Sequence, residues 1–147
     1  NEGIALAKEH SLPQEIIDFI PMHHGRMVMS YFYERAKKIY GEEKVNVDNF
    51  RYPGPKPNTK ETTIVMLADG CESAVRSIEN PDPVKVENVI ESIFKSRAED
   101  RQLEESPVTF RDIKMMKEIT LGYYNKNKEF IMMNEELNTS ILNLKQL

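Results

Sequence analysis

The sequence predicts an all-α protein, and two observations lead to this class. Apolar residues recur at three- and four-residue spacing in about six segments, as amphipathic helices require. No segment alternates apolar and polar residues as a half-buried strand does, and no internal repeat or low-complexity tract interrupts the pattern. We therefore expect a bundle of about six helices.

Length and composition limit the classes of function. The chain has 147 residues, 30% charged and 39% hydrophobic, which suits one globular domain. Its net charge of −4 argues against a binder of duplex nucleic acid, which usually carries a basic face. The longest uncharged central stretch, residues 62–68, is too short to span a membrane. One cysteine and no cleavable signal peptide favour a reducing compartment such as the cytoplasm.

The first two helices are predicted for residues 1–10 and 13–25. Good helix formers fill the first of them. Pro13 suits the first turn of the second helix because its missing N–H would be unpaired there, and Gly25 is a natural C-terminal cap. Pro21 should kink or loosen the last turn. The residues predicted to face inward are Ile16, Ile17 and Ile20.

A third helix is predicted for residues 26–40, followed by an irregular segment over residues 41–58. Three prolines within residues 53–57 exclude a helix there and stiffen the loop. The residues at helical spacing in the third helix are Val28, Tyr31, Phe32, Arg35, Ala36 and Ile39.

The fourth helix, over residues 59–78, shows the clearest pattern in the chain. Asn58 offers an N-cap oxygen, and Glu61 can complete a capping box. The predicted apolar face holds Ile64, Leu67, Ala68, Cys71, Val75 and Ile78. A neighbouring polar face holds Asp69, Glu72, Ser73 and Arg76.

A turn over residues 80–83 separates the fourth helix from the fifth, which runs to about Glu99. Its apolar positions are Val86, Val89, Ile90, Ile93 and Phe94. Residues 100–107 then form a polar connection that leads to the sixth helix.

The sixth helix begins at a capping box formed by Thr109 and Asp112. The residues that continue this helix at helical spacing are Ile113, Met116, Ile119, Thr120 and Tyr123. Beyond this helix the pattern weakens. We therefore assign residues 1–125 to the main domain and residues 126–147 to a C-terminal helical tail that packs on the domain or on a partner.

Several familiar signatures are missing from the sequence. There is no G-x-G-x-x-G, no G-x-x-x-x-G-K-[ST], no G-x-S-x-G and no pair of Cys-x-x-Cys motifs, which excludes Rossmann, P-loop, serine-hydrolase and zinc-ribbon proteins. The residues with chemical potential that remain are the doublet His23-His24 and Asp69.

Adjacent residues on a regular helix point about 100° apart, so neighbouring histidines can serve one metal only where the helix ends. Pro21 and Gly25 supply such an ending around His23 and His24. Neutral imidazoles combined with a carboxylate favour a transition-metal hydrolytic site. The alternative is a pair of helix-terminal histidines, one exposed and one packed.

Asp69 lies beside Leu67 and Ala68 on the fourth helix. A partly desolvated carboxylate is costly unless a cation or a donor accompanies it. A salt bridge with Arg76 and ligation of a metal both satisfy this requirement.

The proline loop brings cations close to the start of the fourth helix, whose N–H groups also favour anions. These cations are Arg51, Lys56 and Lys60. Either they bind phosphate or they are solvated charges on a rigid loop. Cys71 lies on the apolar face and is expected in the core.

Five motifs in order resemble the HD-domain phosphohydrolases. They are Leu12-Pro13-Gln14-Glu15-Ile16-Ile17, Ile20-Pro21-Met22-His23-His24-Gly25, Tyr31-Phe32-Tyr33, the stretch from Phe50 to Pro57, and Met66-Leu67-Ala68-Asp69 with Glu72 and Arg76-Ser77. More narrowly, residues 2–119 look like the intracellular HD domain of the bacterial seven-transmembrane receptor (PgpH-like) type. That family hydrolyses cyclic di-AMP, so the resemblance implies an HD-domain-like bundle and a cyclic dinucleotide as partner.

The resemblance implies a site for two divalent transition-metal ions, manganese or iron, that activate water against a phosphodiester. His23 and His24 match the family's doublet and Asp69 its late aspartate, so these three are the expected metal ligands. The expected substrate-binding cations are Arg51, Lys60 and Arg76.

The family's other ligands, an early His, a His-Asp pair and a further His, have no counterpart here and are expected upstream of Asn1. The 147 residues alone are therefore expected to be an incomplete, inactive fragment that binds metal poorly. Its parent is expected to be membrane-anchored, with this segment in the cytoplasm and not touching the membrane. Apolar residues left by missing helices favour a homo-oligomer.

Two smaller departures from the family pattern concern the pocket. Arg26 stands where the family usually has a small hydroxyl residue, and Gly70-Cys71-Glu72-Ser73 replaces Ser-Val-Glu-Ala. The alternative function is a degenerate HD-like helical module that binds a nucleotide or a protein partner without catalysis.

Overall fold

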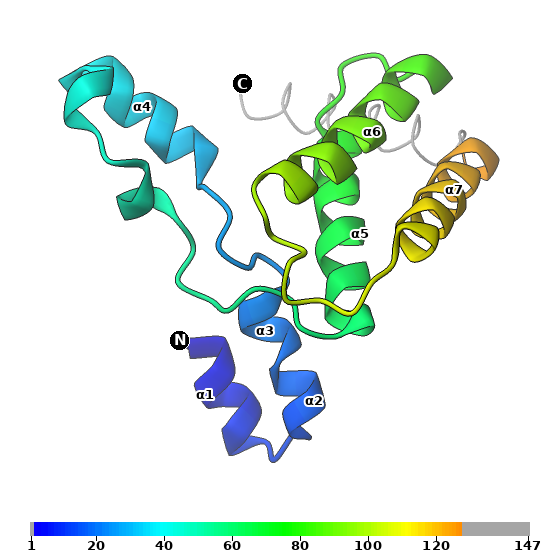
Figure 1. The fold of residues 1–147 in the computed structure, drawn as a ribbon, viewed down its shortest axis with the longest axis horizontal. Coiled ribbons are helices and arrows are strands. Elements are labelled where there is room, and N and C mark those ends of the chain that lie inside the picture. The colour runs from blue at the N-terminus through cyan, green and yellow to red at the C-terminus, as the bar shows by residue number, and fades with distance from the viewer. Residues whose placement is uncertain (1, 128–147) are drawn as a thin grey trace, which may run out of the picture. The chain divides into compact units, whose positions relative to one another are not determined.

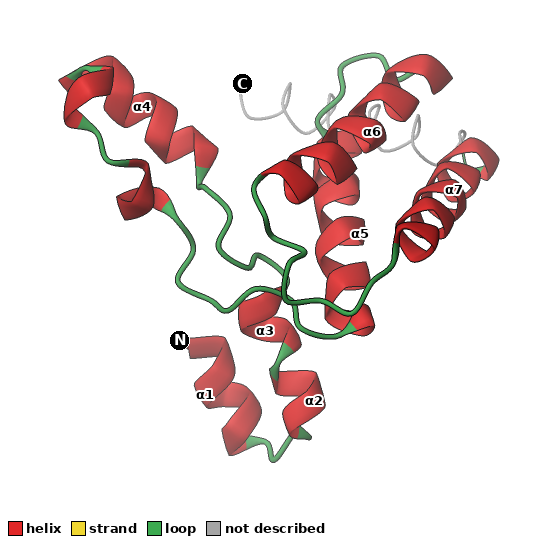
Figure 2. Ribbon diagram, in the orientation of Figure 1, coloured by secondary structure: helices red, strands yellow, loops and turns green. Residues whose placement is uncertain are grey.

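The computed structural model describes residues 2–127, and this part of the chain is built from helices and loops (Figures 1 and 2). Its α-helices are α1 (Glu2–Glu9), α2 (Gln14–Ile17), α3 (Phe19–Met22), α4 (Ser30–Tyr40), α5 (Lys60–Arg76), α6 (Pro83–Glu99) and α7 (Phe110–Lys126). Two short 3-10 helices, η1 (Glu42–Lys44) and η2 (Val47–Phe50), follow α4. The predicted all-α class is confirmed. Among the described helices, none combines the length and apolar character that a membrane span needs.

The described residues divide into two compact units. The first unit contains residues 2–66 and 97–108, and the second contains residues 67–96 and 109–127. Helix α5 passes from the first unit into the second after Met66.

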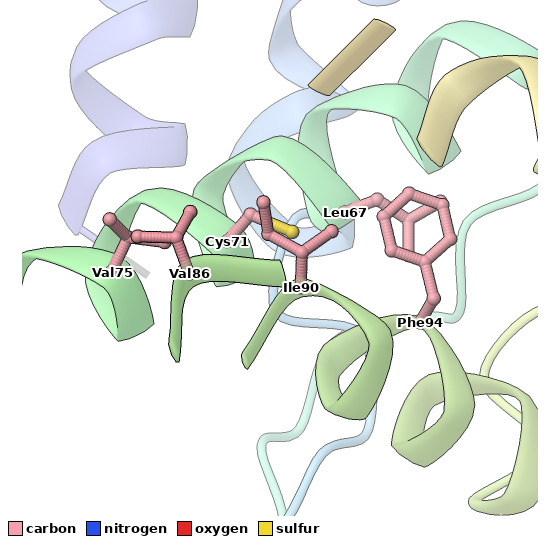
Figure 3. Packing of buried hydrophobic residues seen from close by; sticks show 6 residues of the cluster. All are labelled: Leu67, Cys71, Val75, Val86, Ile90 and Phe94. Atoms are coloured by element: carbon pink, nitrogen blue, oxygen red, sulfur yellow. The ribbon is translucent and has the colours of Figure 1, made fainter. Parts of the chain in front are cut away.

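The second unit is held together by apolar contacts among α5, α6 and α7. Six buried side chains form its centre, and Figure 3 shows them between the facing helices: Leu67, Cys71, Val75, Val86, Ile90 and Phe94. Partly buried residues of α7, including Ile113, Met116 and Tyr124, pack against this cluster. Burying each large apolar side chain stabilises the fold by about 1.5–3 kcal/mol. All six residues of this core were predicted from their three-residue and four-residue spacing in the sequence.

The buried face of α5 turns at its N-terminal end. Thr63 is fully buried there, whereas Ile64 is 46% exposed. Thr63 Oγ1 lies 2.8 Å from Thr59 O and 2.6 Å from Ser106 Oγ, so its hydroxyl is satisfied inside. The prediction that Ile64 and Ala68 face inward is wrong, because hydropathy alone ranked isoleucine above a threonine with local partners.

The N-terminal cap of α7 was predicted correctly, whereas that of α5 lies one residue later than predicted. Thr109 and Asp112 form the predicted capping box of α7, with Thr109 N donating to Asp112 Oδ2 at 2.8 Å. At α5 the reciprocal bonds instead join Thr59 and Thr62, at 3.1 and 3.2 Å. The predicted pair one residue earlier, Asn58 with Glu61, is therefore wrong.

The predicted second helix is two short helices with a break at Asp18. The proline explains the position of the break, because Pro21 has no N–H to donate to Ile17 O, four residues back, and its ring crowds that carbonyl. The kink predicted for the last turn therefore appears one turn earlier. Ile16, predicted to face inward, is half exposed, whereas Ile17 is buried.

The predicted third helix begins at Ser30 rather than at Arg26. Met29 N donates to Phe50 O at 2.7 Å and Tyr52 N to Met27 O at 2.9 Å, with an isolated antiparallel bridge between Val28 and Arg51. Backbone groups that pair with a distant segment cannot also form helical bonds, so the helix starts after them. The predicted tail, residues 126–147, lies outside the described residues apart from its first two positions, and the domain boundary stays a prediction.

Candidate functional site

The histidine doublet lies where α3 ends. His23 is the C-cap residue, and its backbone N donates to Phe19 O at 3.1 Å. Its ring Nδ1 lies 2.9 Å from the same carbonyl. A carbonyl oxygen only accepts, so Nδ1 carries the proton and Nε2 of the neutral ring keeps the lone pair. His23 thus presents the nitrogen that a metal ion would bind.

His24 packs between two rings. Its centroid lies 3.9 Å from that of His23, with an interplanar angle of 40°, and 4.4 Å from that of Tyr52, with which it is stacked at 23°. The Nδ1 atom of His24 is buried. His24 therefore stacks on Tyr52, a residue of the proline loop.

Gly25 makes the sharp turn that follows the doublet. Its φ of +52° is a left-handed conformation that side chains disfavour. A Cβ atom there would lie 2.6 Å from Met66 Cε and 2.7 Å from Gln102 Oε1. The backbone angle favours glycine at this position, and the ends of the Met66 and Gln102 side chains occupy the space that a Cβ atom would take.

The proline loop packs closely against the backbone of α3 at Gly54. A Cβ atom on Gly54 would lie 2.2 Å from Pro21 O, an atom of the helix that carries the doublet. Pro21 precedes the doublet in the sequence. The bond from Tyr52 N to Met27 O, described above, joins the same loop to a residue that follows the doublet. The sequence predicts that prolines stiffen this loop, and its residue Tyr52 stacks on His24.

Arg51, a predicted substrate-binding cation, contacts protein groups on several sides. Its Nη1 donates to Arg26 O at 2.8 Å and lies 3.0 Å from Asp100 Oδ1, while its Nε is 3.2 Å from Asp48 Oδ1. Lys60, a second predicted cation, is the first residue of α5. Arg76, the third, is exposed in the second unit and pairs with Glu72 at 3.0 Å.

Asp69, the predicted third ligand, is half-buried on α5. It belongs to the second unit and the histidines to the first, so its joint ligation with them stays a prediction. Over residues 2–127, no group of three or more His, Cys, Asp or Glu side chains is placed to hold a metal ion.

A polar cavity of about 350 Å³ lies within the first unit. Its walls include Arg26, Arg51, Lys56, Asp100 and Glu104. Several of these charges pair across the cavity rim, since Lys56 lies 3.3 Å from Glu104 and Arg101 also contacts that carboxylate. The bond from Arg101 lowers the pKa of Glu104. The cavity is therefore polar and close to charge balance.

The sequence analysis missed Gln102, which ties this cavity to the doublet. Its side chain is 1% exposed and bonds the backbone N of Arg26 at 2.9 Å. It lies in the connection between α6 and α7, where helical periodicity gives no signal. Residues 97–105 contain six charged side chains and one amide, Gln102. An uncharged amide is easier to bury than a charged group, and this was the signal that could have identified it.

No protein-family model matches the chain. A Synechocystis protein, the uncharacterized protein slr0104, is 42% identical over 122 residues, which are 81% of this chain and 15% of that protein. The cyclic-di-AMP phosphodiesterase PgpH of Bacillus subtilis is 35% identical over 76% of this chain and 16% of its own length. PgpH of Listeria monocytogenes is 37% identical over 84% of this chain and 17% of its own length. The chain thus spans 15–17% of the length of these relatives.

Two solved structures are also similar to this chain. The crystal structure of the L. monocytogenes PgpH HD domain in complex with cyclic-di-AMP has 36% sequence identity and a TM-score of 0.80. The match covers 84% of this chain and 56% of that one. A second crystal structure of that domain has a TM-score of 0.77 over the same shares. The HD-domain-like fold predicted from the sequence is confirmed.

Proposed function

The chain belongs to the PgpH-like HD domains, and from this premise we propose that its full-length protein is a metal-dependent phosphodiesterase that hydrolyses cyclic di-AMP. The supporting observation is the match of 84% of this chain to an HD domain that was crystallised with cyclic-di-AMP. We place the domain in the cytoplasm of a membrane-anchored protein.

The donor chemistry of the doublet fits a transition metal. Nε2 of His23 has its lone pair available because Nδ1 donates to Phe19 O, an arrangement common among metal-binding histidines. We assign His23, His24 and Asp69 as ligands of two divalent ions, manganese or iron. Such ions supply an activated water and polarise the phosphoryl oxygen. The residues of this chain hold the imidazoles in place through Tyr52 and Gly25.

The predicted cations have different parts in this proposal. Arg51 contacts Asp48 and Asp100, so part of its charge is already neutralised by the protein. Arg76 is paired as well, with Glu72 at 3.0 Å. We therefore assign the phosphate contacts to all three cations, Arg51, Lys60 and Arg76, and give Arg51 the additional part of holding the loop. Neutralising phosphate charge in a site that excludes water stabilises the transition state.

We propose that the 147 residues form one part of the metal site. The family's early His, its His-Asp pair and its further His have no match among them. A site that lacks several ligands loses both affinity and geometry. The isolated chain should therefore bind manganese weakly and leave cyclic di-AMP intact.

The test is turnover by the full-length protein with manganese, comparing cyclic di-AMP with cyclic di-GMP. We expect His23→Ala to lower turnover and manganese content together, about 10-fold or more. His10→Ala is the matched control, since His10 is exposed at the end of α1 and should change neither. A full-length protein that binds cyclic di-AMP without cleaving it would favour the non-catalytic module instead.

A further inference from the structure

Gln102 is a buried amide whose polar atoms all face named partners. Its Oε1 accepts from the backbone N of Arg26 at 2.9 Å. Its Nε2 donates to Asp100 Oδ2 at 2.8 Å and to Asp100 O at 3.2 Å. A buried side chain with its hydrogen bonds met is rigid and directional. Gln102 therefore holds the backbone at Arg26 at a defined position relative to Asp100.

These bonds belong to a closed ring of hydrogen bonds that runs from Arg26 N through Gln102, Asp100 and Arg51 back to Arg26 O. The Asp100 carboxylate accepts from Arg51 Nη1, and the same nitrogen donates to Arg26 O at 2.8 Å. Both backbone groups of Arg26 are thus held by side chains, the N–H by Gln102 and the carbonyl by Arg51. The three side chains come from two segments far apart in the sequence, Arg51 from one and Asp100 and Gln102 from the other, and all belong to the first unit.

The ring lies immediately after the histidine doublet. Upstream, the doublet is held by helical bonds, with His23 N donating to Phe19 O and Gly25 N to Met22 O at 3.0 Å. Downstream, only Gly25 separates it from the clamped Arg26. Gln102 Oε1 also closes the space over Gly25, where a Cβ atom would lie 2.7 Å away. The turn is therefore fixed at both ends.

We propose that Gln102 is a positioning residue, which with Asp100 and Arg51 clamps the Arg26 backbone and so holds His23 and His24 in the orientation that binds metal. The inference rests on the proposed function in one respect, the role of the doublet as ligands. Gln102 touches neither metal nor substrate in this scheme. Its effect is on the geometry of the imidazoles, and hence on the affinity of the metal.

The experiment is a manganese titration of the full-length protein without substrate. Gln102→Met keeps the size of the side chain and removes the three bonds that the Gln102 amide makes to Arg26 N and Asp100. We expect about a 10-fold or greater loss of manganese affinity, as is usual when an outer partner of a metal ligand is removed. Arg51→Lys keeps the charge but loses the planar guanidinium, whose Nε contacts Asp48 while its Nη1 contacts Asp100 and Arg26 O, so it should weaken manganese binding in the same direction.

Two controls separate positioning from general loss of stability. Thr63→Val removes a buried hydroxyl whose two partners in the same unit, Thr59 O and Ser106 Oγ, belong neither to the doublet nor to the bonds around Arg26, and thermal unfolding measures its cost. Gln14→Met makes the same chemical change at an exposed glutamine that donates to Asp18. Both controls should keep the wild-type manganese affinity.

Wild-type affinity in Gln102→Met would overturn the inference, as would a loss in Thr63→Val equal to that in Gln102→Met. A wild-type protein that takes up no manganese would overturn it as well. The proposed function fails in a different way, when the wild type binds manganese and does not hydrolyse cyclic di-AMP. In that case the affinities of the variants still decide the role of Gln102.

Discussion

The interactions that stabilise the first unit differ from those that stabilise the second. In the second unit, buried side chains such as Leu67, Ile90 and Phe94 form an apolar cluster between helices. In the first unit, side chains close over Gly25 after the doublet, the backbone of Pro21 closely approaches Gly54, and side chains bond the backbone of Arg26. The apolar cluster stabilises the fold through buried area, whereas the close approaches determine the position of particular atoms.

The difference predicts how each unit responds to substitution. An apolar core tolerates exchanges that conserve volume but not truncation. A turn packed on backbone does not tolerate even one added methyl group, because the neighbouring carbonyl cannot move away as a side chain would. Stability and site geometry should therefore be separable by mutation.

Truncation in the core has the largest expected effect. Phe94 is 5% exposed, and Phe94→Ala should cost about 3–5 kcal/mol of unfolding free energy. Hydrogen-exchange mass spectrometry of the full-length protein should show faster exchange across α6 and α7. Val84→Ala on the same helix is the control, since Val84 is 66% exposed and its loss should cost under about 0.5 kcal/mol. Equal costs would contradict an apolar core at Phe94.

Adding a methyl group beside the doublet comes next. Gly54→Ala would place Cβ 2.2 Å from Pro21 O and should cost about 1–3 kcal/mol, because backbone must shift. Unlike Phe94→Ala, this change should also disturb His24, which stacks on Tyr52 in the same loop. Manganese affinity of the full-length protein measures that effect. An unchanged affinity would mean that the loop does not orient the doublet.

The same substitution in the second unit should have the opposite sign. Gly122 lies inside α7, and an added Cβ would meet no atom within 4 Å. Gly122→Ala should therefore stabilise the helix by about 0.5–1 kcal/mol through lower backbone entropy in the unfolded chain. Slower exchange of the α7 amides would show it. A loss of stability would mean that this face of α7 is covered.

The last prediction concerns pH. Burial raises the pKa of Tyr124 from 10.0 to about 12. Because the folded pKa is the higher one, the stabilising contribution is complete below pH 10 and is lost as pH rises from about 10 to about 12. Tyr124→Phe should flatten that part of the stability profile measured by unfolding. Tyr123→Phe, which alters an exposed neighbour, should not.

Local sequence signals predicted the helices that depend on local interactions. The bounds of α6 and the capping box of α7 followed from prolines, polar caps and apolar spacing, because each of these acts within a few residues. The start of α4 could not be predicted in this way, since Met29 bonds Phe50 across the chain. Neither could the burial of Thr63, whose partners include Ser106, 43 positions away.

The candidate site shows the same division. The placement of His23 and His24 at a helix end followed from Pro21 and Gly25, and the structure has α3 end there. The role of the doublet as ligands remains a prediction. Gln102 carried no periodic or motif signal, because its importance arises from a backbone N–H that is 76 positions away in the sequence.

The sequence alone determined the helical class, the apolar core of the second unit and the turn that ends the doublet, because these follow from periodicity, proline and glycine within short segments. Only the tertiary structure decided that the proline loop lies against Pro21, that Arg51 contacts Asp100 and that Gln102 clamps Arg26. These contacts depend on distances of a few ångströms between segments far apart in the chain. Such distances are set by the packing of the whole unit and leave no pattern in the local sequence.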